Sequence, residues 1–240
     1  MKLEIWSDYA CPYCYIGKRF LEAALAEFEH APEVEIVFRA FELDPTSGPA
    51  VTTTTLDRIM RKYGKSRSDA QAMIDHITSM GDRCGLDMRY ASVRYTNTFD
   101  AHRLTKFAEQ HGRGPDMTER LFRAYFTDNA PLADHDVLVG LAQDVGLDGD
   151  AARATLASTD FAEDVRRDET RASQAGIHGV PFFAFDGAYA LSGAQPKAQL
   201  LAALRQSWKE THKTASGNPT TGMTCDSTGC VIPPSGSGTP

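Results

Sequence analysis

Two cysteines lie close together near the start of the chain, in the run Cys11-Pro12-Tyr13-Cys14. The run falls between a predicted strand and a predicted helix, which puts Cys11 near the helix N-cap and Pro12 near the first helical position. Unpaired backbone amides and the positive end of the helix dipole favour the thiolate of a cysteine placed there. Cys14 falls on the same helix face, within reach of a mixed disulfide on Cys11. This arrangement predicts thiol–disulfide exchange between an exposed nucleophile and a shielded resolving thiol.

A proline precedes a predicted strand late in the chain, in the run Gly179-Val180-Pro181. The apolar residues that follow are typical of a central strand, in which a proline removes a backbone hydrogen bond. A cis Val180–Pro181 bond resolves this conflict. For the run taken alone, a trans proline at the start of the strand is the simpler interpretation. Beside a C-P-Y-C element, the cis bond is favoured.

A second cysteine pair, Cys225 and Cys230, lies in a C-terminal segment rich in Gly, Ser, Thr and Pro. Such a composition cannot bury enough apolar surface to fold by itself and predicts a flexible tail. A C-x4-C pair can close a small ring, bind a metal ion or consist of two unrelated thiols. We interpret it as a candidate second redox pair, because about 12 flexible residues span roughly 19 Å and let the tail reach the first pair.

Two further residues of reactive types have simpler interpretations. His102 has no second histidine or cysteine one helical turn away, so it is expected to be a helix-surface or core histidine rather than a metal ligand. Cys84, near the end of a predicted helix, is expected to be a small buried hydrophobe. No metal site is predicted.

The predicted elements place these residues on an α/β scaffold. Residues 3–7 and 34–38 alternate apolar and polar side chains and predict strands, with a helical stripe at 15–29 between them. The period then stays helical for about 110 residues. Strands return at 180–185 and 189–192 around an Asp-Gly turn, and a helix at 197–210 follows. The predicted helices between the two groups of strands span residues 56–63, 69–84, 98–111, 116–126, 136–145 and 161–175.

The composition excludes several classes of protein. The 240 residues include 25 Lys and Arg against 32 Asp and Glu, a net charge of −7, with no local basic patch, so a nucleic-acid partner is not expected. No run reaches the roughly 20 apolar residues that a membrane span needs. The first residues lack the apolar stretch of a secretory signal, and with Met1 as the natural start we expect a cytoplasmic protein. Thiols stay reduced there, so the five cysteines favour redox or metal chemistry over structural disulfides.

Four runs along residues 1 to about 210 resemble a known family. They are Ser7-Asp8-Tyr9-Ala10-Cys11-Pro12-Tyr13-Cys14, Asn97-Thr98-Phe99-Asp100-Ala101-His102-Arg103-Leu104, Gly179-Val180-Pro181-Phe182-Phe183 and Ser192-Gly193-Ala194-Gln195-Pro196. They are similar to DsbA-type thioredoxin-fold proteins of the FrnE group, which are related to the 2-hydroxychromene-2-carboxylate isomerases and the kappa-class glutathione transferases. The resemblance implies a thioredoxin-like domain at 1–45 and 160–212, interrupted by an all-helical insertion at 46–159 and followed by a flexible tail at 213–240.

The resemblance also implies roles for the residues of the first and third runs. Cys11 is the nucleophile, Cys14 the resolving thiol and Pro181 the cis proline that faces them. Pro12 and Tyr13 support the pair, and the backbone of Val180 pairs with an extended substrate peptide. Strongly oxidising DsbA proteins have Pro-His where this chain has Pro-Tyr. Without that imidazolium the Cys11 thiolate is less stabilised, and we expect a reduction potential between about −270 and about −120 mV, a range open to oxidase, isomerase and reductase roles.

We therefore expect a cytoplasmic protein disulfide oxidoreductase or isomerase that acts on protein thiols and disulfides. Thioredoxin or glutathione is the expected electron partner, and no cofactor is needed beyond the redox-active disulfide. Two alternatives stay open. The first is a glutathione-dependent isomerase or transferase of the 2-hydroxychromene-2-carboxylate isomerase type, although those relatives commonly have serine at the position of Cys11. The second is a structural zinc site made of Cys11, Cys14, Cys225 and Cys230.

Overall fold

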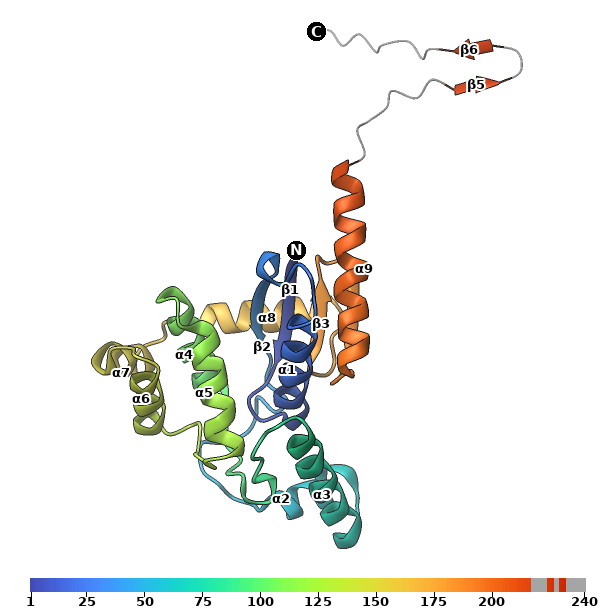
Figure 1. Cartoon of the computed structure of the whole chain (residues 1–240). Coiled ribbons are helices and arrows are strands. Elements are labelled where there is room, and N and C mark those ends of the chain that lie inside the picture. The colour runs from blue at the N-terminus through green and yellow to red at the C-terminus, as the bar shows by residue number, and fades with distance from the viewer. Residues whose placement is uncertain (217–223, 227–228, 232–240) are drawn as a thin grey trace.

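A four-stranded mixed sheet forms the centre of the computed structural model, which describes residues 1–216, 224–226 and 229–231 (Figure 1). Strand β1 (Lys2–Ser7) runs parallel to β2 (Glu35–Ala40) and antiparallel to β3 (Phe182–Phe185), and β4 (Tyr189–Ser192) completes the order β2-β1-β3-β4. A parallel pair needs a crossover connection, which α1 (Pro12–Leu25) supplies. The hairpin of β3 and β4 turns at Asp186 and Gly187, both with positive φ, as the Asp-Gly pair predicts.

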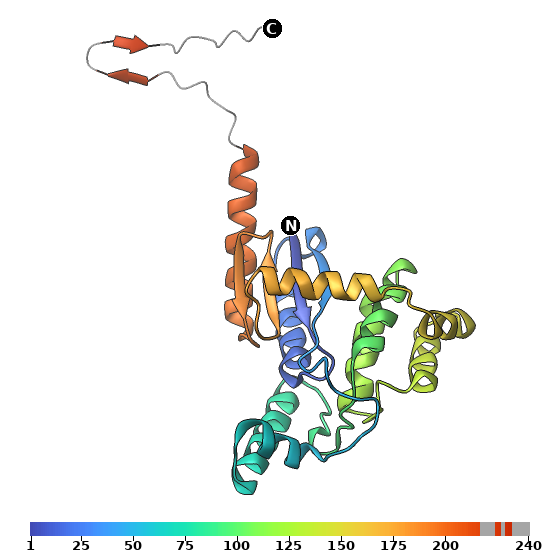
Figure 2. The same ribbon diagram turned by 180° about the vertical axis from the view of Figure 1, so that it is seen from behind.

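Helices cover both faces of this sheet. In Figure 1, α1 and α9 (Lys197–Ser216) lie in front of the strands, and the reversed view in Figure 2 shows α8 (Ala162–Gln174) crossing the other face. Successive side chains along β1 point to opposite faces of the sheet, so β1 contributes to the packing on both faces. Leu3 and Ile5 join an apolar cluster with residues of α1 and α9, whereas Trp6 packs with Ala172 of α8.

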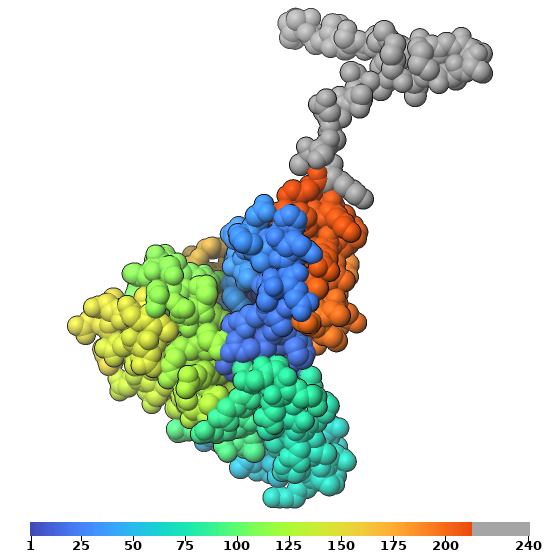
Figure 3. Space-filling view, viewed as in Figure 1, coloured from blue at the N-terminus to red at the C-terminus, as the bar shows by residue number. Residues whose placement is uncertain are grey.

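The chain between β2 and α8 is helical, as its periodicity predicts. Figures 1 and 2 show one pair of these helices beyond the end of α1 and the others beside β2, and Figure 3 shows the two groups as separate projections in teal and in green to yellow. The helices are α2 (Thr55–Tyr63), α3 (Arg67–Arg83), α4 (Phe99–Gln110), α5 (Gly114–Phe126), α6 (His135–Asp144) and α7 (Gly149–Ala157), with a short 3-10 turn at Tyr90–Ser92. Another 3-10 turn, Ala31–Glu33, comes before β2.

One apolar cluster connects α1 to the helical insertion. Tyr15 and Ile16 on α1 pack in it with Phe122 and Phe126 on α5, and the rings of Tyr15 and Phe122 stack with 5.1 Å between their centroids. The other side of α1 contributes Leu21 to the separate cluster beneath α9. Helix α1 therefore supplies side chains to two cores.

Several elements differ from the sequence-based expectations. Helix α7 was not predicted, because its sequence is rich in alanine and lacks an apolar stripe; the Asp148 side chain caps it by accepting a hydrogen bond from the Ala151 amide. Helix α1 ends at Leu25 rather than at residue 29, and Phe28 reaches the core from the turn that follows. Strand β3 begins at Phe182, after the proline, rather than at residue 180.

The C-terminal segment also departs from the prediction in part. Helix α9 continues to Ser216 instead of ending at residue 210, and two short strands, β5 (Thr224–Asp226) and β6 (Gly229–Val231), pair antiparallel. The remainder of the predicted tail lies outside the described residues. Within the described part of the chain, no helix is long and apolar enough to cross a membrane.

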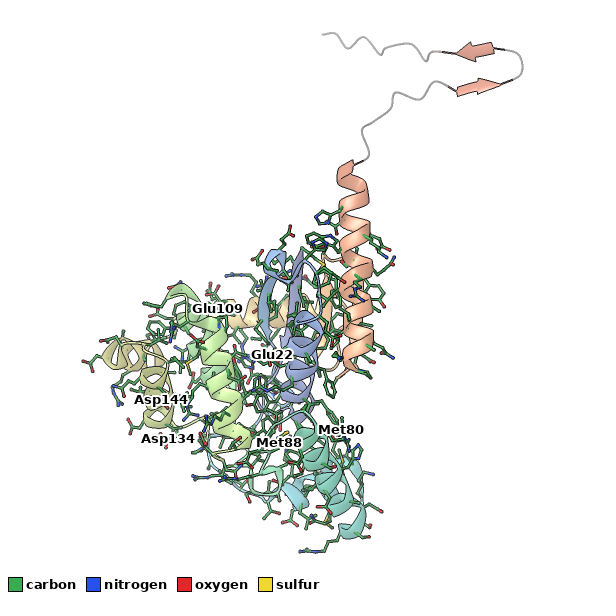
Figure 4. The ribbon with its side chains drawn as sticks, in the orientation of Figure 1. Glu22, Met80, Met88, Glu109, Asp134 and Asp144 are labelled. Carbon is green, nitrogen blue, oxygen red and sulfur yellow. The ribbon has the colours of Figure 1, made fainter. Side chains whose placement is uncertain are left out.

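Gly81, inside α3, allows a close contact that gives a testable consequence for stability. A Cβ atom at this position would lie 2.6 Å from the Met88 sulfur and 3.2 Å from the Met88 Cβ; Met88 is labelled beside α3 in Figure 4. We expect Gly81→Ala to lower the free energy of unfolding by about 1–3 kcal/mol, because the buried Met88 must move. Gly140→Ala in α6 is the matched control. A Cβ there meets nothing within 4 Å, and we expect it to raise stability by about 0.5–1 kcal/mol. If urea unfolding showed the same change in stability for both variants, the close contact between Gly81 and Met88 would not matter for stability.

Candidate active site

The first residues of α1 carry the two cysteines in the arrangement that the sequence predicts. Cys11 is the N-cap residue, with extended backbone angles, and Pro12 occupies the first turn, where a missing N–H costs nothing. The Cys11 amide donates to the Asp8 carbonyl at 3.0 Å, and the Cys14 amide donates to the Cys11 carbonyl at 3.1 Å. The cysteine thiols are both free. The structure thus shows the dithiol state with Cys14 one turn into the helix.

The segment before β3 closes the site from the opposite side. The Val180–Pro181 peptide bond is cis, and the Cys11 thiol donates to the Val180 carbonyl with 3.5 Å between Sγ and O. Gly17 on α1 makes the close approach feasible, because a Cβ there would lie 3.2 Å from Cγ of Pro181. The structure therefore brings Cys11, Val180 and Pro181 together from residues far apart in sequence. Gly17 was not singled out from the sequence, since a glycine inside a helix gives no signal of what it faces.

The burial of Cys11 corrects one expectation. The sequence predicts an exposed nucleophile, yet Cys11 is only 4% exposed and Cys14 3%. Cys11 is covered because its thiol turns toward the Val180 carbonyl, and Val180 and the half-buried Tyr13 pack against the same apolar cluster. Exposure therefore does not distinguish the two thiols.

Electrostatics at Cys14 give it a distinct chemical character. Burial raises the pKa of the Cys14 thiol well above its usual value, and hydrogen bonding and charge interaction with Cys11 raise it further. Ser7 and the Asp8 backbone offset this rise only in part. Cys14 therefore holds its proton at neutral pH, as a resolving thiol does until a mixed disulfide has formed.

Asp8 connects the cysteine loop to two other segments. It is 1% exposed, and its carboxylate accepts hydrogen bonds from the Ala10 amide at 3.1 Å, the Leu43 amide at 2.7 Å and the Thr98 hydroxyl at 2.9 Å. The bond from Thr98 shows that the run at residues 7–14 and the run at residues 97–104 meet in space. Sequence reasoning assigned no role to Asp8; the signal was its place in the first run.

A pocket of about 550 Å3 lies close to Asp8. Its wall includes Leu43, whose amide donates to the Asp8 carboxylate, and Asp44. Three cations also line it: Arg58, Arg61 and Lys62. The Arg58 guanidinium lies 3.3 Å from the centroid of the Tyr95 ring, which fixes it by a cation–π contact. Such a wall is suited to a ligand that carries carboxylates.

The remaining reactive residues lie in other places. Cys84 is half-buried rather than buried, because it follows the last residue of α3, and its thiol donates to the Gly81 carbonyl at 3.2 Å. His102 is a core residue on α4, 4% exposed, not a helix-surface one. Among the residues that the structure describes, no group of three or more His, Cys, Asp or Glu side chains could hold a metal ion. The side chains of Cys225 and Cys230 lie outside the described part, although their backbones face each other in β5 and β6.

Comparisons with known proteins agree with this fold. Two solved structures share the fold at low identity. The first is 2-hydroxychromene-2-carboxylate isomerase, with a TM-score of 0.63 and 14% identity; the match covers 90% of this chain and 100% of that one. The second is the cytosolic disulfide reductase DsbM from Pseudomonas aeruginosa, with a TM-score of 0.57 and 17% identity; this match also covers 90% of this chain and 100% of that one. A probable DsbA oxidoreductase from Streptomyces coelicolor is much more similar, with 39% identity, a TM-score of 0.84 and coverage of 98% of this chain and 100% of its own. The DSBA-like thioredoxin domain model matches residues 2–205. These findings confirm the expected DsbA-like thioredoxin fold, and the chain belongs to the DSBA-like thioredoxin domain family.

Proposed function

We propose that this chain is a thiol–disulfide oxidoreductase that acts on protein disulfides through Cys11 and Cys14. The observation that supports this most is the place of the Cys11 thiol, at the N-terminus of α1 and 3.5 Å from the Val180 carbonyl, with the buried Cys14 behind it. The helix N-terminus stabilises the thiolate that attacks. The Val180 backbone next to it offers an extended peptide a strand-like partner.

The exchange follows from these roles. The Cys11 thiolate attacks one sulfur of a substrate disulfide, so that a Cys11–substrate disulfide forms and the other substrate sulfur leaves as a thiolate and takes up a proton. Cys14 then loses its proton and attacks the Cys11 sulfur. The substrate leaves as a dithiol, reduced by two electrons, and the Cys11–Cys14 disulfide remains. Run in reverse, the same steps oxidise a substrate dithiol.

Glutathione or thioredoxin is the electron partner in this proposal. The pocket with Arg58, Arg61 and Lys62 favours glutathione, whose carboxylates these cations can bind. A solved structure of similar fold is the cytosolic disulfide reductase DsbM with GSH, and we propose a cytoplasmic location for this chain as well.

The same pocket supports a second candidate, a glutathione-dependent isomerase or transferase. A 2-hydroxychromene-2-carboxylate also carries a carboxylate that Arg58 or Arg61 can bind. Two assays, insulin reduction and turnover of the chromene carboxylate, distinguish the two functions. The oxidoreductase is expected to reduce insulin disulfides with glutathione or with thioredoxin and its reductase, and to leave the chromene carboxylate unchanged. Turnover of the chromene without insulin reduction would select the second function.

The order of alkylation tests the roles of the two thiols. With limiting iodoacetamide at about pH 7, we expect Cys11 to be labelled before Cys14, because the pKa of Cys14 is raised and a thiol reacts through its thiolate. Peptide mass spectrometry reads the order, and Cys84, on its separate helix end, serves as the internal reference. Labelling of Cys14 first would reverse the assignment.

Cys225 and Cys230 are proposed as a second redox pair that exchanges electrons with Cys11 and Cys14. The backbone pairing of β5 with β6 supports this, since it sets the two residues opposite each other in register. Truncation after Lys213 tests it: an unchanged potential of the first pair, together with tail thiols that never appear oxidised by mass spectrometry, would refute the coupling.

A further inference from the structure

A buried histidine with an unpartnered ring nitrogen lies against Tyr9, in the loop that leads into α1. His102 on α4 is 4% exposed, and its Nε2 has no hydrogen-bond partner among the described residues. The Asp8 carboxylate is 3.8 Å away, too far for a hydrogen bond, and the Tyr9 ring lies against the imidazole with 4.8 Å between centroids. Because a buried polar atom without a partner is costly, such an atom in a native protein usually has a function or a water partner.

A small cavity lies between His102 and Ser7. Its volume is about 10 Å3, and Ser7, Thr105 and Lys106 line it together with His102. A polar cavity of this size accommodates one water molecule. Ser7 is 6% exposed and also reaches Cys14: burial and Cys11 raise the pKa of the Cys14 thiol, and a hydrogen bond with the Ser7 side chain works against that rise. Ser7 thus shares the cavity with His102 and also acts on the Cys14 thiol.

We propose that His102 accepts, through Ser7 and one water molecule, the proton that Cys14 loses when it resolves a mixed disulfide. The Ser7 hydroxyl takes the thiol proton and passes its own proton to the water, which protonates Nε2 of His102. The Cys14 thiolate attacks the Cys11 sulfur, the Cys11–Cys14 bond forms, and the substrate sulfur leaves as a thiolate that is protonated from solvent. The role rests on the proposed oxidoreductase function. His102 touches no substrate and acts only through Ser7.

The charges around His102 suit this task. Asp8, at 3.8 Å, stabilises an imidazolium, and Tyr9 contacts the ring from the same loop. Two cations from α4 and β2, Lys106 and Arg39, share the cavity wall but are held by Asp168, at 2.8 Å and 3.1 Å. Lys106 also lies 3.4 Å from Glu109, which is labelled on α4 in Figure 4. Their charges are therefore compensated, so they oppose protonation of His102 only weakly.

Rapid-mixing kinetics separates this step from the first attack. The reduced full-length protein is mixed with an excess of a disulfide peptide, and acid-quenched samples are analysed by mass spectrometry. Capture on Cys11 is second order in peptide, whereas resolution by Cys14 is independent of its concentration. We expect His102→Phe and Ser7→Ala each to slow resolution roughly 100-fold, the scale of general acid–base effects, and to leave capture within about twofold. The deficit should shrink at alkaline pH, where hydroxide removes the Cys14 proton directly.

Two further variants separate loss of the proton acceptor from a general disturbance of packing. His102→Gln preserves a polar side chain of similar size but cannot carry a proton, so it should slow resolution as His102→Phe does. His111→Gln replaces a histidine at the end of the same helix that does not line the cavity, and this variant should resolve at the rate of the unaltered protein. Normal resolution in both His102 variants would overturn the proposal, as would a His111→Gln defect of equal size. A wild-type protein that does not capture the peptide would instead refute the proposed function itself.

Discussion

Cys11→Ser is expected to reduce the rate of disulfide exchange to the rate measured without protein. The serine hydroxyl stays protonated at neutral pH even at the N-terminus of α1, so no nucleophile remains beside the Val180 carbonyl. Insulin reduction and the rapid-mixing assay both measure this loss. A residual rate above one tenth of wild type would show that another thiol performs the first attack.

Cys14→Ser is the informative partner of that variant. It keeps Cys11 and removes the resolving thiol, so we expect the protein to capture a peptide and hold it as a stable one-to-one mixed disulfide, visible as added mass. Cys84→Ser is the matched control, because the Cys84 thiol donates to the Gly81 carbonyl of its own helix, and it should neither trap peptide nor lose activity. Trapping by Cys11→Ser in place of Cys14→Ser would invert the roles.

Asp168→Ala is expected to have the largest effect on stability. Asp168 on α8 is 3% exposed, and its carboxylate receives Arg39 at 3.1 Å, Lys106 at 2.8 Å and the Ala40 amide at 3.1 Å. Removing it leaves the buried Lys106 and the partly buried Arg39 without their shared anion, and although Arg39 keeps its pair with Glu4, we expect a cost of about 3–5 kcal/mol. Urea unfolding followed by tryptophan fluorescence measures the loss, since Trp6 donates its indole N–H to the Asp168 carbonyl.

Asp164→Ala supplies the control on the same helix. Asp164 pairs with Arg167 at 2.8 Å, but both side chains are largely open to solvent, 42% and 64% exposed. Exposed pairs contribute at most about 1 kcal/mol, and we expect a change of about 0.5 kcal/mol or less. Similar losses for Asp164→Ala and Asp168→Ala would show that the α8 carboxylates act through helix propensity rather than through buried charge.

The local features of the site could be predicted from the sequence because local signals determine them. The alternation along β1, the Cys-Pro start of α1 and the apolar period of α1 fix where Cys11 and Cys14 stand, with no long-range information needed. A proline before an apolar strand likewise indicated the special backbone at Val180–Pro181. The roles of these residues stay predictions for the experiments above.

What the sequence could not predict depends on contacts between distant segments. The low exposure of Cys11 comes from Val180, 169 positions away. The three donors to Asp8 come from the cysteine loop, the segment after β2 and the residue before α4, and no periodicity links them. Helix α7 was missed for a different reason, since an alanine-rich helix has little apolar contrast for a pattern to detect.

The two cores that share α1 have a consequence for how this chain can vary. Tyr15 and Ile16 fix one side of the redox helix against α5, and Leu21 fixes the other side beneath α9. Substitutions in the helical insertion, at Phe122 for example, therefore alter the support of the turn that carries Cys14 without touching the sheet. Changes in α5 can therefore alter how firmly the first turn of α1 is held while every residue of the Cys11-Pro12-Tyr13-Cys14 run stays the same.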